Sequence, residues 1–137
     1  MADIKYKDYS KEVLRTMDNI ITVWLYESAG ELKSRVQRNT AVDTGQLKNS
    51  WDYKVDTVKK EATIGSPLQN AIWEEFGTGQ YALEGNGRKT PWFYNDKDGK
   101  GHWTHGKHPR RAFWNAYESA KNAIERALQS KIKELSK

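Results

Sequence analysis

The sequence predicts an α+β domain: a small antiparallel sheet with long N-terminal and C-terminal helices packed on one face, and a protruding arm rich in glycine and aromatic residues. Three observations predict this class. Apolar residues recur at three- and four-residue steps near both ends, two short alternating segments lie between them, and glycine is concentrated in one later stretch. The 137 residues, 36% of them hydrophobic, suit a single domain with one core.

The first predicted helix runs from Ser10 to about Arg38. Its apolar residues form one stripe, which must be buried against a large neighbour. They are Val13, Leu14, Met17, Ile20, Ile21, Trp24, Leu25, Leu32 and Val36. The run "IITVWLY" in this helix is too short to cross a bilayer, so we expect no membrane contact.

The next segment, "VDTGQLKNSW", predicts the entry to the sheet. Asp43 and Gln46 have the spacing of a capping box, in which Asp43 accepts a backbone N–H at the start of a short helical turn. Alternating residues then predict an antiparallel hairpin over residues 51–65. Its expected inward-facing residues are Trp51, Tyr53, Val55, Ala62 and Ile64.

A short helix is predicted after the hairpin, with Ser66 as its N-cap, Pro67 as its first residue and Gly77 as its stop. Glu74 and Glu75 are adjacent in this helix and do not face each other, which argues against an acid–base pair. We expect one of them to be a structural anchor beside the loop 77–79 and the other to be solvated.

Residues 78–106 are predicted to form an extended loop or hairpin arm within the domain. Seven of the ten glycines lie between residues 77 and 106, and the aromatic pieces "PWFY" and "HWTH" flank a turn signal at Asp98-Gly99. A long loop in so small a domain is typical of a binding or assembly element, or of a partly disordered segment. We therefore expect its aromatic side chains, Trp92, Tyr94 and Trp103, to contact partners.

The last segment begins at Pro109 and is predicted to form a second long helix. Its Ala120, Ala123 and Ala127 would allow close approach of another helix. Residues 107–137 hold eight Lys or Arg against three Glu, which accounts for the whole net charge of +5. Arg110 and Arg111 lie near the helix N-terminus, where cations are unfavourable and an external anion would compensate. They are further candidates for partner contacts, including DNA, although a solvated helix face is the simpler interpretation.

The triplet Asp43-Thr44-Gly45 raises the possibility of catalysis, because it is also the active-site signature of aspartic proteases. In those enzymes the triplet follows an apolar strand in a mostly β fold. Here it follows a long amphipathic helix, so we expect Asp43 to be structural. A protease with a single triplet remains the weaker alternative.

Metal and cofactor sites are not expected. The chain has no cysteine, which excludes disulfides and thiolate ligands. His102, His105 and His108 are three residues apart, but the stretch contains Gly106 and Pro109 and does not read as a helix. In a strand, residues three apart point to opposite faces, so these imidazoles would not converge on one ion.

Three short motifs stand in a fixed order between the two long helices. They are Thr-Gly-x-Leu-x-x-Ser at residues 44–50, Glu-Phe-Gly-Thr-Gly at 75–79, and a Gly-x-x-Pro segment leading to Phe113 at 106–113. In this order they resemble the tail-component family (tail-completion, head–tail joining) of long-tailed bacteriophages and prophages. One extra residue precedes Phe113, and Ala41 stands where many members have Pro. The motif residues carried over are Asp43, Thr44, Gly45, Leu47, Glu75, Phe76, Gly77, Thr78, Gly79 and Pro109.

The resemblance implies a non-enzymatic structural virion protein at the head–tail junction or tail, assembled in the host cytoplasm. It implies contacts with other tail or connector proteins and a homo-oligomeric ring in the virion, whereas the isolated chain could be a monomer. Contact with DNA would be secondary. A basic nucleic-acid-binding module is the main alternative, because the C-terminal segment is basic and Trp92, Trp103 and Trp114 lie near it in sequence.

Overall fold

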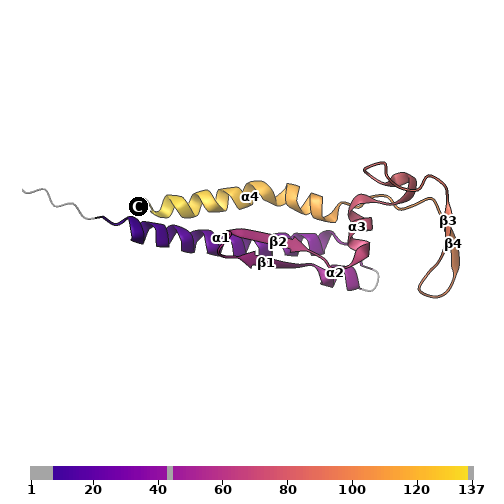
Figure 1. Ribbon diagram of the computed structural model, residues 1–137, viewed down its shortest axis with the longest axis horizontal. Coiled ribbons are helices and arrows are strands. Elements are labelled where there is room, and N and C mark those ends of the chain that lie inside the picture. Colours follow the sequence, from indigo (N-terminus) through magenta and orange to yellow (C-terminus); the bar gives the residue numbers. More distant parts are fainter. Residues whose placement is uncertain (1–7, 43–44, 136–137) are drawn as a thin grey trace, which may run out of the picture.

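The computed structural model describes residues 8–42 and 45–135, and its two long helices give it an elongated shape (Figure 1). Helix α1 (Ser10–Asn39) and helix α4 (Ala112–Leu135) run antiparallel along the long axis. The indole Nε1 of Trp24 donates to the carbonyl oxygen of Ile124 at 2.7 Å, and Nη1 of Arg35 donates to the hydroxyl of Ser119 at 3.0 Å. Both predicted helices are confirmed, and they pack against each other.

Small residues let α4 approach α1. Ala112, Ala116 and Ala120 are buried, because the inward stripe of α4 advances in steps of four residues. Ala123 and Ala127 lie off this stripe and are exposed, so their predicted role in the helix contact is wrong. The stripe of α1 is also shorter than expected, since its buried residues begin at Leu25 while Val13 and Leu14 are exposed.

The predicted hairpin is present and lies against α1. Strands β1 (Asp52–Asp56) and β2 (Glu61–Gly65) pair antiparallel, with Tyr53 opposite Ile64 and Val55 opposite Ala62. These four side chains are half-buried and share the face that meets α1. Helix α4 packs mainly on α1, so α1 is the layer that joins the sheet to α4. The α+β class is confirmed.

Two short helices close one end of the molecule, and both begin later than predicted. Helix α2 (Gln46–Ser50) has Gly45 at its N-cap with a φ of 84°, so Gln46 is the first helical residue and not the third, as a capping box needs. Asp43 and Thr44 lie outside the described residues. Helix α3 (Gln69–Phe76) has Leu68 at its N-cap. Ser66 instead accepts a hydrogen bond from the Leu68 N–H at 3.2 Å, so Ser66 and Pro67 form the turn before the helix.

The core lies at this same end. It is formed by Val36, Leu47, Trp51, Ala71 and Ala116, with Leu68 and Phe113 packed against it. Trp51 Nε1 donates to the hydroxyl of Thr40 at 3.0 Å, and that hydroxyl donates to the Val36 carbonyl at 2.6 Å. The indole is thus buried with its one polar atom satisfied, which avoids a cost of about 1–3 kcal/mol.

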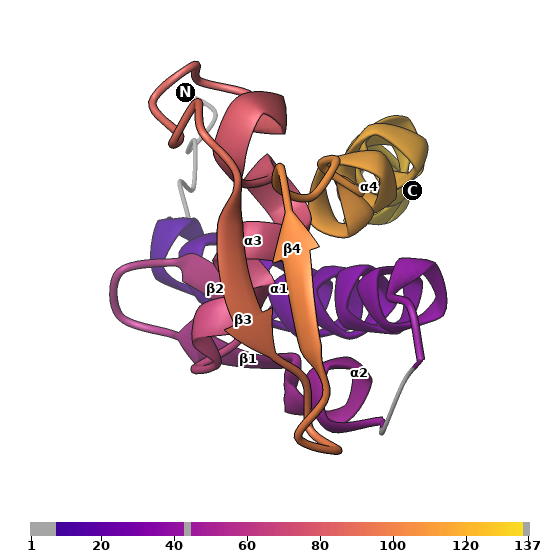
Figure 2. The same ribbon diagram turned by 90° about the vertical axis from the view of Figure 1, so that its right-hand side faces the viewer.

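The predicted arm extends beyond the helical end of the molecule (Figures 1 and 2). A 3-10 turn, η1 (Gly79–Tyr81), leads into it, and strands β3 (Trp92–Asn95) and β4 (Gly101–Thr104) form its antiparallel hairpin. Figure 2 shows the arm crossing in front of the end where α2 and α3 lie. Within the described part of the chain, no helix is both long and apolar enough to cross a membrane.

Candidate functional site at the base of the arm

The three sequence motifs meet at the base of the arm. Leu47 of the first motif and Phe113 of the third belong to the same core, and Ala71 brings in the helix that carries the second motif. The Trp51 and Phe113 rings are 6.1 Å apart, which joins the start of the hairpin to the start of α4. Segments separated by more than sixty residues therefore build one junction.

Glu75 fastens the second motif to helix α4. Its Oε2 accepts from the backbone N–H of Phe113 at 2.9 Å, and its Oε1 accepts from the N–H of Trp114 at 3.0 Å. The first N–H groups of a helix have no partner within the helix, and a carboxylate there is also favoured by the helix dipole. Its side chain is only 12% exposed. The prediction that one of the two glutamates is a structural anchor is confirmed for Glu75.

Glu74 is not solvated as predicted. Its carboxylate forms an ion pair with the ammonium of Lys107, and its side chain is only 16% exposed. Its backbone carbonyl accepts from the N–H of Arg110 at 2.7 Å. Glu74 therefore ties the end of α3 to the segment that returns from the arm.

The Gly-Thr-Gly loop pairs with that returning segment. Thr78 donates its N–H to the Lys107 carbonyl at 2.9 Å, and Gln80 donates to the His105 carbonyl at 3.0 Å. The Lys107 N–H in turn donates to the hydroxyl of Thr78 at 2.9 Å. The segment that enters the arm and the segment that returns from it are thus held together where they leave the body.

Glycine is required at two positions of this loop. Gly77 has a φ of 76° and Gly79 a φ of 62°, in the left-handed region that other residues rarely adopt. A Cβ on Gly77 would lie 2.9 Å from Cδ of Pro109, and a Cβ on Gly79 would collide with the His105 carbonyl oxygen. The second motif therefore needs glycine for close contact with the third motif, and Gly77 ends α3 as predicted.

Arg110 and Arg111 already have partners within the chain. Arg110 Nε donates to the carbonyl of Asn39 at 3.0 Å, at the end of α1, where a cation suits the helix dipole. Arg111 lies 3.7 Å from Glu75 and stacks over the rings of Phe76 and Trp114. Glu75 supplies the anion that the sequence led us to seek outside the protein, which removes that argument for DNA binding.

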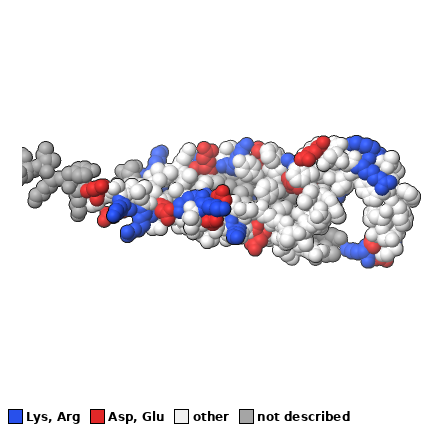
Figure 3. Space-filling view, viewed as in Figure 1, with Lys and Arg blue, Asp and Glu red and all other residues white. Residues whose placement is uncertain are grey.

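The arm presents aromatic side chains on both faces. Phe93 and Trp103 lie opposite each other with ring centroids 5.8 Å apart, and they are 54% and 73% exposed. Tyr94 stacks on His102 on the other face at 5.4 Å. Trp92 is half-buried beside Arg88, whose guanidinium lies 5.9 Å from the ring. Figure 3 shows an uncharged middle section of the arm between two charged ends.

Phe93 was missed by the sequence reasoning, which selected Trp92, Tyr94 and Trp103. The signal was present in the alternation of "PWFY", because neighbouring strand residues face opposite ways. Phe93 shares its face with Trp103, and its ring also covers Gly101 across the hairpin. The partner-contact role of the arm residues stays a prediction.

The three histidines lie in separate settings. His102 Nε2 is 2.7 Å from Oδ2 of Asp96 in the arm turn, and the ring of His108 stacks on Tyr81 at 3.8 Å. The hydrogen bond from His102, followed by that from the Lys100 N–H, lowers the pKa of Asp96 below its usual range. Among the described residues, no three His, Cys, Asp or Glu side chains are grouped to hold a metal ion.

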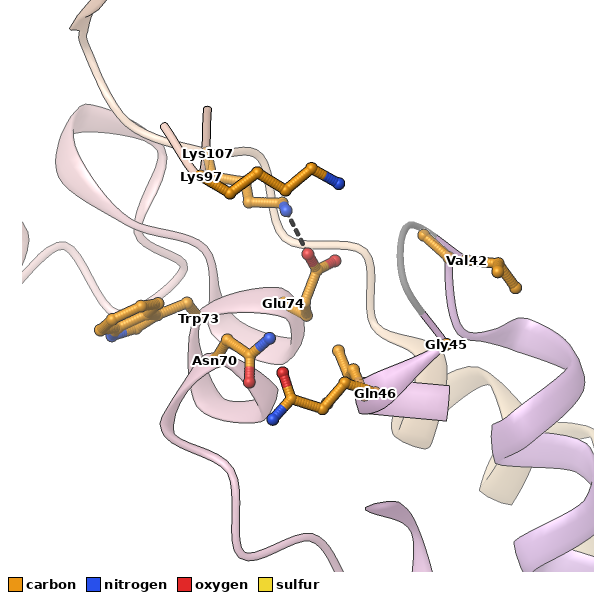
Figure 4. Close-up of a pocket in the computed structure, with 10 residues that line it drawn as sticks. Val42, Gly45, Gln46, Asn70, Trp73, Glu74, Lys97 and Lys107 are labelled. Carbon is orange, nitrogen blue, oxygen red and sulfur yellow. Dashed lines mark hydrogen bonds and ion pairs between the residues drawn. The ribbon is translucent and has the colours of Figure 1, made fainter. Parts of the chain in front are cut away.

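A cavity of about 460 Å³ separates the arm turn from the body (Figure 4). Glu74 and Lys107, which line this cavity, form an ion pair, while the side chains of Asn70 and Gln46 point toward one another. Lys97 reaches it from the arm. The protease triplet cannot be placed beside it, since Asp43 and Thr44 lie outside the described residues.

Comparison with known proteins identifies the chain. No curated protein and no solved structure matches it. One family model does match, over residues 5–77, and its description is "Bacteriophage HK97-gp10, putative tail-component". The match covers more than half of the chain and includes the first motif and the Glu75-Phe76-Gly77 part of the second. The chain belongs to the HK97-gp10-like family of bacteriophage tail components.

Proposed function

We propose that this chain is a non-enzymatic structural protein of a tailed phage or prophage, acting in tail completion or head–tail joining. It works through contacts with connector and tail proteins and with further copies of itself, arranged as a ring in the virion. Family membership supports a tail component in general, and the junction at the arm base supports the finer assignment.

One observation carries the proposal: the described polar groups in and beside the second and third motifs are engaged in holding the base of the arm. Glu75 caps α4, Thr78 pairs with Lys107, and Glu74 joins α3 to the returning chain. An enzyme needs reactive groups that face a substrate. Here the motif residues stabilise a fixed base, and the exposed aromatic rings lie farther out, where they suit contact with neighbouring proteins.

The proposed places of action are the head–tail junction or the tail of the virion, after assembly in the host cytoplasm. Phe93 and Trp103 are large, exposed and carried on a hairpin, so they can enter a partner surface without a change in the body. DNA is at most a secondary partner, since Arg110 and Arg111 are engaged within the chain.

The test is particle assembly in phage or prophage lysates that carry a Trp103→Ala variant. We expect unjoined heads and tails, or tails of abnormal length, in electron micrographs, with normal amounts of folded protein. Trp73→Ala is the matched control, because Trp73 is an exposed tryptophan on α3 outside the arm. Normal particles from a chain with both Phe93 and Trp103 replaced by alanine would overturn the proposal.

A second arm of the test addresses the protease alternative. Asp43→Asn removes the carboxylate that such an enzyme would need. We expect virion proteins in this variant to show the same masses as in wild-type particles. Accumulation of uncleaved precursors would favour the protease instead.

A further inference from the structure

A groove runs along the body between strand β2 and helix α4. One cavity of about 580 Å³ is lined by Ala62 and Ile64 of β2 and by Tyr117 of α4. A second cavity of about 540 Å³ continues from Ile64 to Phe76 and Trp114. Ile64 lines both cavities, so they are neighbours at the end of β2, and we refer to the two together as the groove. Both β2 and α4 pack on α1, and Leu25, Ala29 and Leu32 of α1 line the first cavity between them.

One wall of the groove is the edge of a strand. In the described part of the chain, β2 pairs with β1 and with no other strand, so its second edge carries backbone groups without a strand partner. Ala62 and Ile64 turn toward α1, and the exposed Thr63 turns away. An extended strand added at this edge would lie over α1 and place alternate side chains in the groove.

The arm has the properties that this groove requires. Among the described strands, β3 and β4 pair only with each other, and a hairpin of two strands alone is marginally stable in water. Its strands have four residues each, close to the five of β2. Phe93 and Trp103 place two large rings on one face of it. The arm therefore offers both a strand edge and a pair of apolar side chains.

We propose that the arm of one copy adds to the β2 edge of a second copy and places Phe93 and Trp103 in the groove beside Tyr117 and Trp114. This inference rests on the proposed structural function and names the contact by which copies join. The arm cannot fill its own groove in this structure, since it lies at the far end of the body beyond α3 (Figure 1).

A second copy is favoured as the occupant because both halves of the contact are present on this one chain. A contact between two different patches of identical chains is heterologous, so each copy uses its arm toward one neighbour and its groove toward the other. Repetition of such a contact closes a ring when the rotation between copies permits it.

The exposed aromatic surface indicates how strong one contact would be. The two facing patches contain five aromatic side chains that are between 40% and 73% exposed: Phe76, Phe93, Trp103, Trp114 and Tyr117. At roughly 200 Å² for each ring, they would bury on the order of 500 Å². A stable interface needs about 1,200 Å² or more, so a single contact should be weak and strand pairing or ring closure should strengthen it.

The test uses one variant of each half and measures association by sedimentation velocity over a concentration series. Trp103→Ala removes the largest ring of the arm, and Tyr117→Lys places a charge in the groove at an exposed position of α4. Trp73→Ala is the control for loss of an exposed tryptophan elsewhere. Circular dichroism checks that every variant keeps its helices.

We expect each of the two variants alone to associate at least tenfold more weakly than the wild type, while the control is unchanged. A mixture of the two variants should recover dimers and stop there, because one intact arm still meets one intact groove. Dimers in the mixture that are absent from either variant alone would establish the heterologous contact.

Three results would overturn this inference, and they differ in what they mean for the proposed function. Oligomers that persist in both variants would show that copies join through another surface, and the structural function would stand. A wild-type chain that stays monomeric up to about 1 mM, yet whose arm binds a purified tail or connector protein, would assign the arm to that protein instead. Binding to neither would remove the structural function as well.

Discussion

The two hairpins of this chain have the same local structure and different surroundings. In each, an aspartate closes the turn: Asp56 accepts from the N–H groups of Val58 and Lys59, and Asp96 accepts from those of Asp98 and Lys100. The β1–β2 hairpin turns its apolar face onto α1, whereas no described helix or strand forms a packed layer against the β3–β4 hairpin. Burial stabilises the first, and the second depends on its turn, its cross-strand rings and its base.

The difference separates residues that fold the chain from residues that are free to bind. An apolar ring at the first hairpin contributes to the free energy of unfolding, because the folded state removes it from water. A ring on the arm stays in water in the isolated chain and contributes little. The same residue type should therefore give opposite results in the two hairpins.

The largest effect is expected from Trp51→Ala, at the start of the first hairpin. Trp51 is buried and bonded to Thr40, so its loss should lower the free energy of unfolding by about 3–5 kcal/mol, as measured by urea denaturation. Trp103→Ala, the matched change in the arm, should cost less than about 0.5 kcal/mol. Equal losses from the two substitutions would break the contrast between the hairpins.

Gly79→Ala should weaken the base of the arm by about 2–4 kcal/mol. The substitution combines an unfavourable φ with a collision against the His105 carbonyl. Gly85→Ala is the control, because Gly85 also has a positive φ but open space around its Cβ position. Hydrogen exchange at the Gln80 N–H should accelerate in the first variant only. Similar exchange in both would show that φ alone, and not the close contact, requires the glycine.

Glu75→Ala should destabilise the chain by about 1–3 kcal/mol, because two N–H groups at the start of α4 lose their acceptor. The effect should concentrate at the junction, with faster hydrogen exchange at Phe113 and Trp114. Glu118→Ala is the matched control on the exposed face of α4, where the ion pair with Lys121 is worth about 0–0.5 kcal/mol. A uniform loss across α4 in both variants would argue against capping.

The sequence predicted the elements well because each depends on local pattern. The spacing of apolar residues located α1 within one residue, and the alternation around Tyr53 and Ile64 located the first hairpin. Asp98-Gly99 marked the turn of the arm, and Gly99 there has a φ of 83°. These signals depend on a few neighbouring residues and do not depend on tertiary contacts with the rest of the chain.

The junction was predicted less well because its bonds join distant segments. Nothing near Glu75 in sequence indicates that its carboxylate caps a helix starting nearly forty residues later. The same bond explains why Arg110 and Arg111 were taken for anion-binding residues: their compensating charge lies in another motif. The start of α3 was also predicted wrongly, with Ser66 as the N-cap, because a serine turn and a helix N-cap look alike in sequence.

The smallest effect is expected when the pH is lowered, and it should distinguish the turn of the arm from the turn of the first hairpin. The pKa of Asp96 is lowered first by its hydrogen bond with His102, so this carboxylate supports the arm turn above pH 3.8 and loses that support as the pH falls through its lowered pKa. Carboxyl titration by nuclear magnetic resonance should therefore give Asp96 a midpoint below 3.8. His102→Ala should return the midpoint toward the ordinary value. It should leave the aromatic signals of the first hairpin unchanged, since no hydrogen bond between described residues joins the two hairpins. An Asp96 midpoint that does not respond to His102→Ala would mean that the backbone N–H groups alone hold the turn, as they do at Asp56. The arm would then differ from the first hairpin in burial alone.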